Sequence, residues 1–329
     1  MRGRGNTLPR VVVGALTFGA IGLVACGGSE ETDQPPEPKV TDFPAPEGRT
    51  LDELVASTEP TDQVVVLPAG QVVNKGTTRF PFGVFTDANE PIDDAMVAIY
   101  AAPAKNGEAD GPAQGPFPAQ PKSLGTDPAY ASETTAQDQE APEVFYAADL
   151  ELDRKGEWQL LAMIREGDVL RSTRVPSLVA NQFDEVPQEG DPAIVVDTPT
   201  ADDVGGDLAQ IDTRVPPSTM HEDNFADVVG EKPTVLLFAT PALCISRVCG
   251  PVVDIAEQVK EQTDADVSFI HMEIFEDNQF DNGPREQVRA YGLPTEPWVF
   301  VFDGDGDVDT VFEGPFSAEE LQEAVDRVS

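Results

Sequence analysis

The stretch of sequence that decides the fold is KPTVLLFATPALCISRVCGP, residues 232–251. Its first part, residues 234–239, is apolar on both faces of an extended chain, which is typical of a central strand covered by helices. Cys244 and Cys249 follow, and Gly250-Pro251 then precedes an amphipathic run. Because proline is tolerated in the first turn of a helix but not inside one, we expect a helix to begin there. The stretch therefore predicts a buried strand, a turn with two cysteines and a helix.

Helix and strand alternate on both sides of this stretch. The predicted order is βαβ, then a helix, a β-hairpin and a closing helix, which together define an α/β unit over residues 217–329. The apolar patterns place helices at residues 221–229, 252–263, 285–291 and 318–328, and strands at residues 234–239, 267–275, 298–302 and 308–312.

Two motifs in the α/β unit carry a family resemblance. Residues 232–251 resemble the first strand, the active-site turn and the first helix of thioredoxin-like proteins. Residues 296–304, Glu-Pro-Trp-Val-Phe-Val-Phe-Asp-Gly, resemble the cis-proline turn of that family and the hairpin after it. The resemblance implies a thioredoxin-like fold for this unit. It also implies thiol–disulfide exchange at Cys244 and Cys249, with substrate peptides binding at Pro297 and Glu296.

The cysteine spacing departs from the family pattern. The family motif is C-x2-C, whereas Cys244 and Cys249 form C-x4-C. Five positions on an α-helix correspond to about 500°, so two helical thiols would lie about 140° apart, and a bridge needs a non-helical turn. If the helix begins near Cys249, that sulfur lies closest to the positive helix end, and which thiol attacks first stays open. In an oxidising compartment we expect the pair to form a disulfide, either a catalytic one or a structural one that pins the turn.

Other positions near the motif also differ from the family. Leu243 stands where thioredoxins have an aromatic residue, and Leu237 stands where they have a buried acid that assists proton transfer. Arg247 is a nearby cation and can lower a thiol pKa. Pro297 has a second interpretation, as a structural proline at the start of a strand. An inert disulfide therefore stays the alternative to exchange.

These residues support three functional hypotheses. The primary hypothesis is a thiol–disulfide oxidoreductase, and the second is a non-enzymatic envelope protein that binds partners and keeps a structural disulfide. The third is copper handling, because His221 and His271 each adjoin a methionine and, with the two cysteines, offer soft ligands. This arrangement resembles Sco-type copper chaperones, although their cysteines form C-x3-C, and a packed histidine inside a strand is the alternative for His271.

Apart from the copper hypothesis, we expect no metal and no cofactor. The chain has no phosphate-binding glycine loop, no zincin motif and no Ser-His-Asp signature.

Residues 1–25 have the pattern of a bacterial export signal. Arg2, Arg4 and Arg10 precede an uncharged apolar run over residues 11–25, which is shorter than the roughly 20 residues that a membrane-spanning helix needs. Residues 23–26, Leu-Val-Ala-Cys, resemble a lipobox, which implies a lipoprotein signal peptide cleaved before Cys26 and a palmitate-type lipid on Cys26. We therefore expect a lipoprotein anchored in the cell membrane, on its extracytoplasmic face.

The chain between Cys26 and the α/β unit divides by composition. Residues 26–60 are poor in apolar side chains and predict a disordered tether. Residues 61–180 contain short β-branched and aromatic runs between turn signals, which predict an antiparallel β-sandwich and resemble the Ig-like modules of bacterial envelopes. Residues 103–143, within them, form a Pro/Ala-rich stretch that we expect to be a long loop. Residues 181–216 predict a linker with one short strand at residues 193–196.

The chain is strongly acidic, with 21 Lys and Arg against 60 Asp and Glu in 329 residues and a net charge of −39. Such a surface repels phosphate backbones, which excludes nucleic acid as a partner. The length predicts about two domains, an all-β Ig-like sandwich followed by an α/β thioredoxin-like fold. The partners that we expect are thiols and disulfides of extracytoplasmic proteins and, through Cys26, the membrane.

Overall fold

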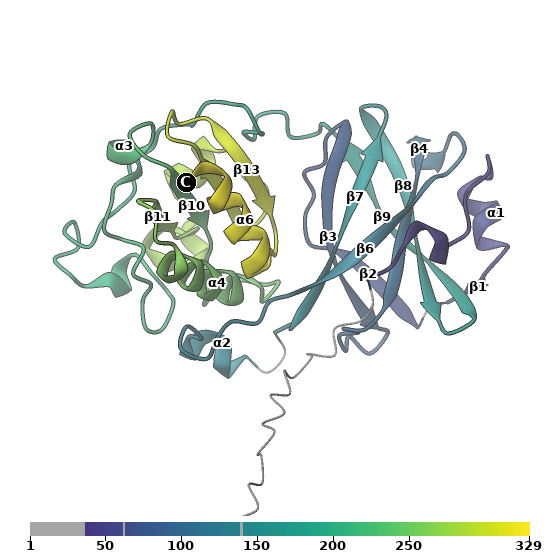
Figure 1. The fold of residues 1–329 in the computed structure, drawn as a ribbon, viewed down its shortest axis with the longest axis horizontal. Coiled ribbons are helices and arrows are strands. Elements are labelled where there is room, and N and C mark those ends of the chain that lie inside the picture. The colour runs from purple at the N-terminus through teal and green to yellow at the C-terminus, as the bar shows by residue number, and fades with distance from the viewer. Residues whose placement is uncertain (1–36, 62, 139–140) are drawn as a thin grey trace, which may run out of the picture. The chain divides into compact units, whose positions relative to one another are not determined.

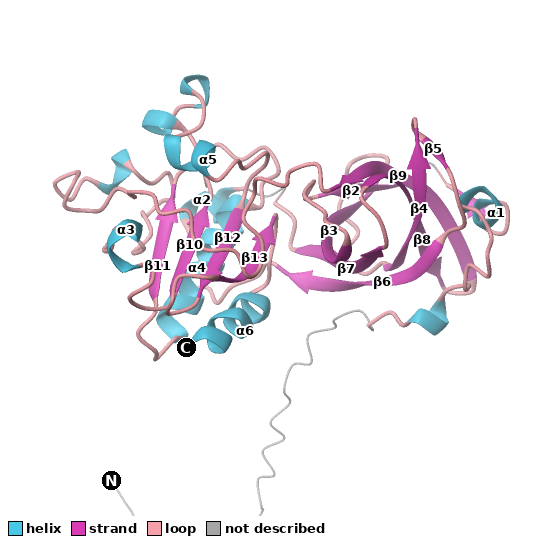
Figure 2. Cartoon of the chain, turned by 90° about the horizontal axis from the view of Figure 1, so that it is seen from above, coloured by secondary structure: helices cyan, strands magenta, loops and turns pink. Residues whose placement is uncertain are grey.

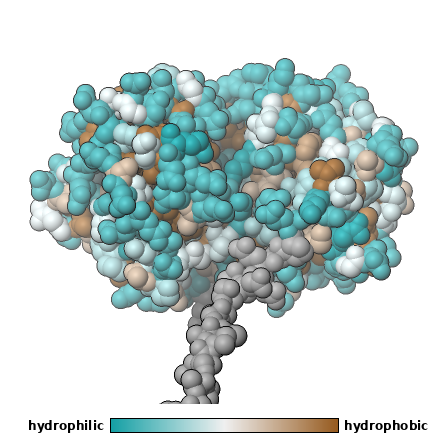
Figure 3. Space-filling model, in the orientation of Figure 1, coloured by the Kyte–Doolittle hydropathy of each residue, from teal (hydrophilic) through white to brown (hydrophobic). Residues whose placement is uncertain are grey.

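A computed structural model describes residues 37–61, 63–138 and 141–329. The predicted signal peptide, the lipidation site Cys26 and the tether up to residue 36 lie outside these residues. Within the described ranges, no helix is both long and apolar enough to cross a membrane. The face drawn in Figure 3 is mostly hydrophilic, which agrees with the excess of acidic residues.

The first part of the described chain is a nine-stranded sheet, which we call the β unit, residues 59–180. Figure 2 shows that this sheet curls round on itself. The hydrogen-bonded order of its strands is β1-β9-β8-β4-β6-β7-β3-β2, and β5 pairs with β4. The strands are β1 (Glu59–Pro60), β2 (Val64–Pro68), β3 (Gly76–Thr86), β4 (Met96–Lys105), β5 (Glu108–Ala109), β6 (Gln114–Ser123), β7 (Val144–Leu152), β8 (Gly156–Glu166) and β9 (Val169–Ala180).

The two-sheet sandwich expected for residues 61–180 is not confirmed, because β6 joins the strands into one sheet. The first half of β6 pairs with β4, where Ala119 lies opposite Val97. Its second half pairs with β7, where Gln120 lies opposite Ala147. The β unit is therefore a single curled sheet.

The long loop expected over residues 103–143 is also wrong. This stretch contains β5, β6 and a short helix, α2 (Glu133–Gln137). Its many prolines argued against a strand. However, each half of β6 has one hydrogen-bonded neighbour, as an edge strand does, and edge strands tolerate proline.

The expected tether is wrong for residues 37–60, which pack on the β unit. This segment contains η1 (Val40–Asp42) and α1 (Leu51–Val55). Phe43, Leu51 and Leu54 are buried in one cluster with Tyr100 of β4 and Leu161 of β8. Because successive side chains of a strand alternate between its faces, this cluster covers the face of β4 opposite to the interior of the curled sheet. Burial of these side chains, together with hydrogen bonds from Tyr100 and Arg165 to the carbonyl oxygens of Pro44 and Asp42, holds the segment on the β unit.

The α/β unit contains a four-stranded sheet in the order β11-β10-β12-β13. Figure 2 labels all four strands side by side, and Figure 1 shows α4 and α6 beside this sheet. β10 is parallel to β11 and antiparallel to β12, and β13 is antiparallel to β12. Every residue of β10, β11 and β12 is buried, as their continuous apolar runs predict. The predicted order of helices and strands is confirmed. The elements are η2 (Leu208–Gln210), α3 (Phe225–Val228), β10 (Thr234–Phe238), α4 (Cys249–Gln262), β11 (Ser268–Met272), η3 (Glu276–Asn278), η4 (Phe280–Asn282), α5 (Glu286–Ala290), β12 (Trp298–Phe302), β13 (Val308–Glu313) and α6 (Ala318–Val328).

The four-stranded sheet is covered on both faces. On one face, Val235 and Leu237 of β10 pack in a cluster with residues of α4 and α6. On the other face, Leu236 and Phe238 pack with residues of α5 and of the segment before this unit. The alternation along β10 therefore explains why both of its faces are apolar.

Residues 181–216, predicted as a linker, form part of that second face. Val186 is buried there, and Ile194 and Val196 pack against the same cluster. The strand expected at residues 193–196 is absent from the described elements, and an isolated bridge between Pro192 and Asp307 takes its place. A few apolar side chains thus fix an acidic segment to the sheet.

Candidate functional site

The two cysteines lie at the turn between β10 and α4. α4 begins at Cys249, as Gly250-Pro251 predicts. Arg247, between the cysteines, has a positive φ of 61°, a left-handed conformation that reverses the direction of the chain. The sulfurs of Cys244 and Cys249 and a carboxylate oxygen of Glu296 consequently lie within 4.8 Å of one another. Both thiols are free, so the structure describes the reduced form of the pair and not the expected disulfide.

The two thiols differ in burial and in acidity. Cys249 is fully buried and Cys244 is partly exposed. The pKa of Cys244 is lowered to about 6, and a hydrogen bond from the Cys249 thiol is the largest cause. Ser246 Oγ, 3.2 Å from the Cys244 sulfur, and the backbone N–H groups of Cys249 and Val248 also lower it, while burial acts in the opposite direction. Burial raises the pKa of Cys249 well above its ordinary value. One thiol therefore ionises near neutral pH while the other stays protonated.

Glu296 supplies a carboxyl group to the cysteine pair. Burial, and then the charges of Cys244 and Glu273, raise the pKa of Glu296 to about 7. An acid with this pKa exchanges protons readily near neutral pH. Glu296 is thus a carboxyl group close to both thiols that can take up or release a proton.

Sheet register explains how Glu296 reaches the cysteines. Glu296 and Pro297 are joined by a cis peptide bond and immediately precede β12. Because Trp298, at the start of β12, pairs with Phe238 at the end of β10, the residue before Pro297 lies beside the turn that follows β10. The sequence assigned Glu296 to substrate binding and missed its contact with the thiols. The acid directly before the predicted cis-proline was the available signal.

The two histidines of the chain meet at a second buried cluster. Asp212 Oδ2 lies 2.9 Å from His221 Nε2 and 3.3 Å from His271 Nδ1. Burial disfavours a charge on His271, but the Asp212 carboxylate outweighs it and raises the pKa of His271 to about 9. Burial lowers the pKa of His221. Asp212 was missed because its segment looked like a linker, and nothing in its local sequence marks it.

The copper hypothesis required the histidines and cysteines to act together. Among the described residues, the potential ligands fall into two separate groups, Asp212 with His221 and His271, and Glu296 with the two thiols. The methionines beside the histidines pack into different apolar clusters, Met220 with α4 and Met272 with α5. The soft ligands therefore do not converge on one site.

Two hydrogen bonds hold the backbone between β10 and Cys244. His271 Nε2 lies 3.1 Å from the carbonyl oxygen of Ala239, directly after β10. Thr213 Oγ1 accepts a hydrogen bond from Ala242 N and donates one to Glu273 Oε1. The backbone before the cysteines is thereby held at two points.

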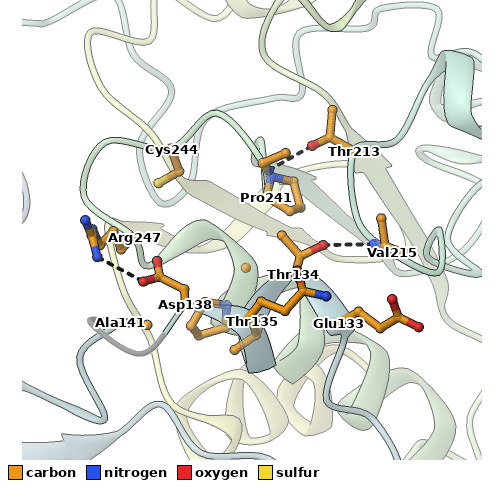
Figure 4. A pocket seen from close by; sticks show the side chains of 14 residues that line it. Glu133, Thr134, Thr135, Asp138, Ala141, Thr213, Val215, Pro241, Cys244 and Arg247 are labelled. Carbon is orange, nitrogen blue, oxygen red and sulfur yellow. Dashed lines mark hydrogen bonds and ion pairs between the residues drawn. The ribbon is translucent and has the colours of Figure 1, made fainter.

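A cavity of about 570 Å³ opens beside Cys244. Figure 4 shows that its walls come from the cysteine turn, from residues near Thr213, and from α2 and the residues after it. Arg247 Nη1 bonds Asp138 Oδ1 at 2.9 Å across this cavity. Its volume is in the range of small-molecule and peptide side-chain sites. Cys244 therefore lies beside a cavity that α2, Asp138 and Ala141 help to form.

A buried ion pair anchors α2 to the α/β unit. Arg214 Nε lies 2.7 Å from Asp254 Oδ1, and both side chains are more than nine-tenths buried. Asp254 Oδ2 also accepts hydrogen bonds from the backbone and hydroxyl of Ser132, at the start of α2. Arg214 Nη2 donates to the carbonyl oxygen of Tyr130. The wall formed by α2 is therefore fixed to α4.

The solved structures to which the chain is similar include two of low similarity. The thiol:disulfide interchange protein, a thioredoxin family protein from Chlorobium tepidum TLS, is 19% identical with a TM-score of 0.30, over 44% of this chain and 99% of that chain. The C-terminal domain of ZirS is 11% identical with a TM-score of 0.16, over 50% of this chain and 97% of that chain. No protein-family model matches the chain, and no curated protein matches it. At these values the likeness is too slight to assign an activity.

Proposed function

We propose that the α/β unit is a thioredoxin-like thiol–disulfide oxidoreductase in which Cys244 attacks and Cys249 resolves. The observation that carries this proposal is the asymmetry of the pair. Cys244 is accessible and its pKa is lowered to about 6, whereas Cys249 is buried and its pKa is raised. An attacking thiol needs thiolate character and access, and a resolving thiol needs only proximity to its partner.

The exchange proceeds in two steps. The Cys244 thiolate attacks one sulfur of a substrate disulfide, which forms a mixed disulfide and releases one substrate thiolate. Cys249 then loses its proton, and its thiolate attacks the Cys244 sulfur, which closes the Cys244–Cys249 disulfide and releases the second substrate thiolate. The substrate gains two electrons and, in solution, two protons, while the protein dithiol is oxidised. The reverse sequence oxidises a substrate dithiol.

Glu296 accepts the proton of Cys249 in the second step. The raised pKa of Cys249 makes unassisted ionisation slow. The carboxylate of Glu296 lies within 4.8 Å of both sulfurs, and its pKa of about 7 leaves a substantial ionised fraction at neutral pH. Glu296 also lies beside the thiols, and we assign the backbone of the turn at Glu296 and Pro297 to docking of the substrate peptide.

Two cysteine variants of the full chain test the proposal. Cys249→Ser is expected to accumulate a mixed disulfide at Cys244 when a small disulfide such as oxidised glutathione is added, because the resolving thiol is absent. Cys244→Ser is expected to form none at Cys249 while the protein is folded. Peptide mass spectrometry after acid quenching identifies the modified cysteine.

A pair that serves as an inert disulfide gives different results in the wild type. A thiol reagent would then trap neither Cys244 nor Cys249 until the protein is unfolded, and the reduction potential of the pair would lie below about −300 mV, as for structural disulfides. A potential above about −250 mV would agree with exchange.

For the location of the protein, we propose a lipid anchor on Cys26 that holds the described units at the extracytoplasmic face of a membrane. The support is the sequence pattern of residues 1–26. In cells that carry out lipoprotein processing, labelled palmitate is expected on the wild type and on Cys244→Ser, but not on Cys26→Ser. Labelling of Cys26→Ser would contradict the anchor. The substrates we propose are accordingly disulfides of extracytoplasmic proteins.

A further inference from the structure

The buried histidine cluster brings four polar atoms together. Asp212 Oδ2 lies 2.9 Å from His221 Nε2 and 3.3 Å from His271 Nδ1. Ser218 Oγ lies 3.2 Å from the same atom of His221 and 3.3 Å from the same atom of His271. All four side chains are at most 2% exposed. Three of these residues precede α3, whereas His271 belongs to β11.

The spacing of these atoms fits a tetrahedral metal ion. Zinc binds nitrogen and oxygen at about 2.0–2.1 Å, so two neighbouring ligand atoms of a tetrahedral site are separated by about 3.3 Å. The distances of 3.2 and 3.3 Å from Ser218 Oγ, and of 3.3 Å between Asp212 and His271, match this edge. The contacts at 3.3 Å are longer than ordinary N–H···O hydrogen bonds. The Asp212–His221 contact of 2.9 Å is an ordinary hydrogen bond, whereas the other three distances agree with the edges of a tetrahedral site.

The surroundings hold two of the ligand side chains in place. His271 Nε2, the ring nitrogen remote from the cluster, faces the carbonyl oxygen of Ala239 at 3.1 Å. A histidine that donates its remote N–H to a carbonyl presents its other nitrogen to a metal. The Asp212 carboxylate is held by the backbone N–H groups of Arg214 at 2.8 Å and Ser218 at 2.6 Å. The His271 ring and the Asp212 carboxylate are thus held in place by the backbone around them, whereas His221 Nδ1 has no hydrogen-bond partner among the described residues.

Asp212 is the charged ligand of the cluster, and its side chain is buried. Histidine binds a metal as the neutral imidazole, so the Asp212 carboxylate is the group that supplies negative charge to an ion bound at this position.

We propose that Asp212, His221 and His271 form a structural zinc site, with Ser218 Oγ at the fourth corner. Zinc suits a closed tetrahedral site of nitrogen and oxygen ligands, and the thiols and thioethers that would select Cu(I) lie elsewhere. The ion fixes the segment before α3 to β11, beneath the cysteine turn. The site does not depend on the proposed redox function.

The test is metal binding by the full chain after removal of metals with a chelator. Isothermal titration with Zn²⁺ is expected to show one equivalent bound by the wild type. His221→Asn and His271→Gln are each expected to weaken binding by more than about 100-fold, the upper end of what changes around an intact ligand set cause. The matched control is the double variant Cys244→Ser with Cys249→Ser, which removes the other potential ligand group and is expected to bind as the wild type does.

Cobalt keeps the test decisive if a histidine variant fails to fold. Co²⁺ bound by the wild type at the nitrogen and oxygen ligands gives weak visible bands and lacks the intense near-ultraviolet band of thiolate ligation. No stoichiometric binding by the wild type would overturn the proposal. So would binding that the cysteine double variant loses, or a thiolate band in the cobalt spectrum of the wild type.

Discussion

The reactivity of Cys244 should follow a pH profile that an ordinary cysteine does not show. Cysteine in a model peptide titrates near about 8.5, whereas Cys244 titrates at about 6. At pH 5.5 about a quarter of Cys244 is thiolate, against about a thousandth of an ordinary thiol, a ratio of about 240. A thiolate of lower pKa is also a weaker nucleophile. With a Brønsted coefficient of about 0.45, the pKa difference of about 2.5 lowers its rate constant about 13-fold.

The two effects predict rate curves that cross. Against a free thiol such as N-acetylcysteine, Cys244 should react about 20-fold faster at pH 5.5 and about tenfold slower at pH 9. The assay is stopped-flow reaction of the full-chain Cys249→Ser variant with 4,4′-dithiodipyridine, and peptide mass spectrometry separates Cys244 from Cys26. Acid slows the reaction because it protonates the thiolate, so the rate should fall to half its plateau at about pH 6, the pKa of Cys244.

A second variant tests the cause of the lowered pKa. Cys249→Ser keeps a hydroxyl donor beside Cys244, whereas Cys249→Ala removes the donor that contributes most to the shift. A hydrogen bond to a charged group contributes about 1.5–3 kcal/mol, which corresponds to about one to two pH units. The midpoint should therefore move to about 7–8 in Cys249→Ala. A midpoint near 8.5 in Cys249→Ser, or equal profiles in the two variants, would refute the reasoning.

Three further changes test other parts of the molecule. Glu296→Gln removes the proton acceptor, so formation of the Cys244–Cys249 disulfide from the mixed disulfide at pH 7 should slow at least about 100-fold, while the mixed disulfide itself should form at nearly the same rate. Rapid-quench mass spectrometry separates the two steps. Equal rates of the second step in the wild type and the variant would show that Glu296 is not the proton acceptor. Asp254→Ala leaves the buried Arg214 unpaired and should lower the free energy of unfolding in urea by about 3–5 kcal/mol, whereas Asp184→Ala at an exposed ion pair should leave it unchanged. Leu54→Ala, at a buried position, should lower the free energy of unfolding by about 2–5 kcal/mol. Val40→Ala, at a position that is 58% exposed, should leave it unchanged. Equal values for the two variants would indicate that this segment is a disordered tether after all.

The sequence predicts the α/β unit well because its signals are local. The run before Cys244 is apolar on both faces, and Gly250-Pro251 marks the start of α4, so strand and helix follow from neighbouring residues. The β unit is predicted less well because the pairing of β6 with β4 and then β7 joins distant parts of the chain. Composition could not reveal that pairing, since prolines and small residues are equally typical of a loop.

The same contrast applies to the candidate sites. Cys244 and Cys249 are visible as a motif, and the two histidines stand out because the chain has no others. Asp212 does not, because its role depends on a contact with His271, which lies 59 positions away. Leu54 likewise looks like an isolated apolar residue until the outer face of β4 is known. Local patterns therefore identify reactive residues, while their partners emerge only from the fold.

The C-x4-C spacing is compatible with a lowered thiol pKa at Cys244, even though Cys244 lies outside α4. If both cysteines were helical, their thiols would point about 140° apart. The left-handed residue Arg247 instead turns the chain back, so the Cys244 sulfur faces the backbone N–H groups of Val248 and Cys249, at the start of α4. A helix N-terminus stabilises a thiolate through such unpaired N–H groups, whether or not the cysteine belongs to the helix. The longer spacing therefore keeps the electrostatic advantage of the helix end for Cys244 and buries Cys249 behind it.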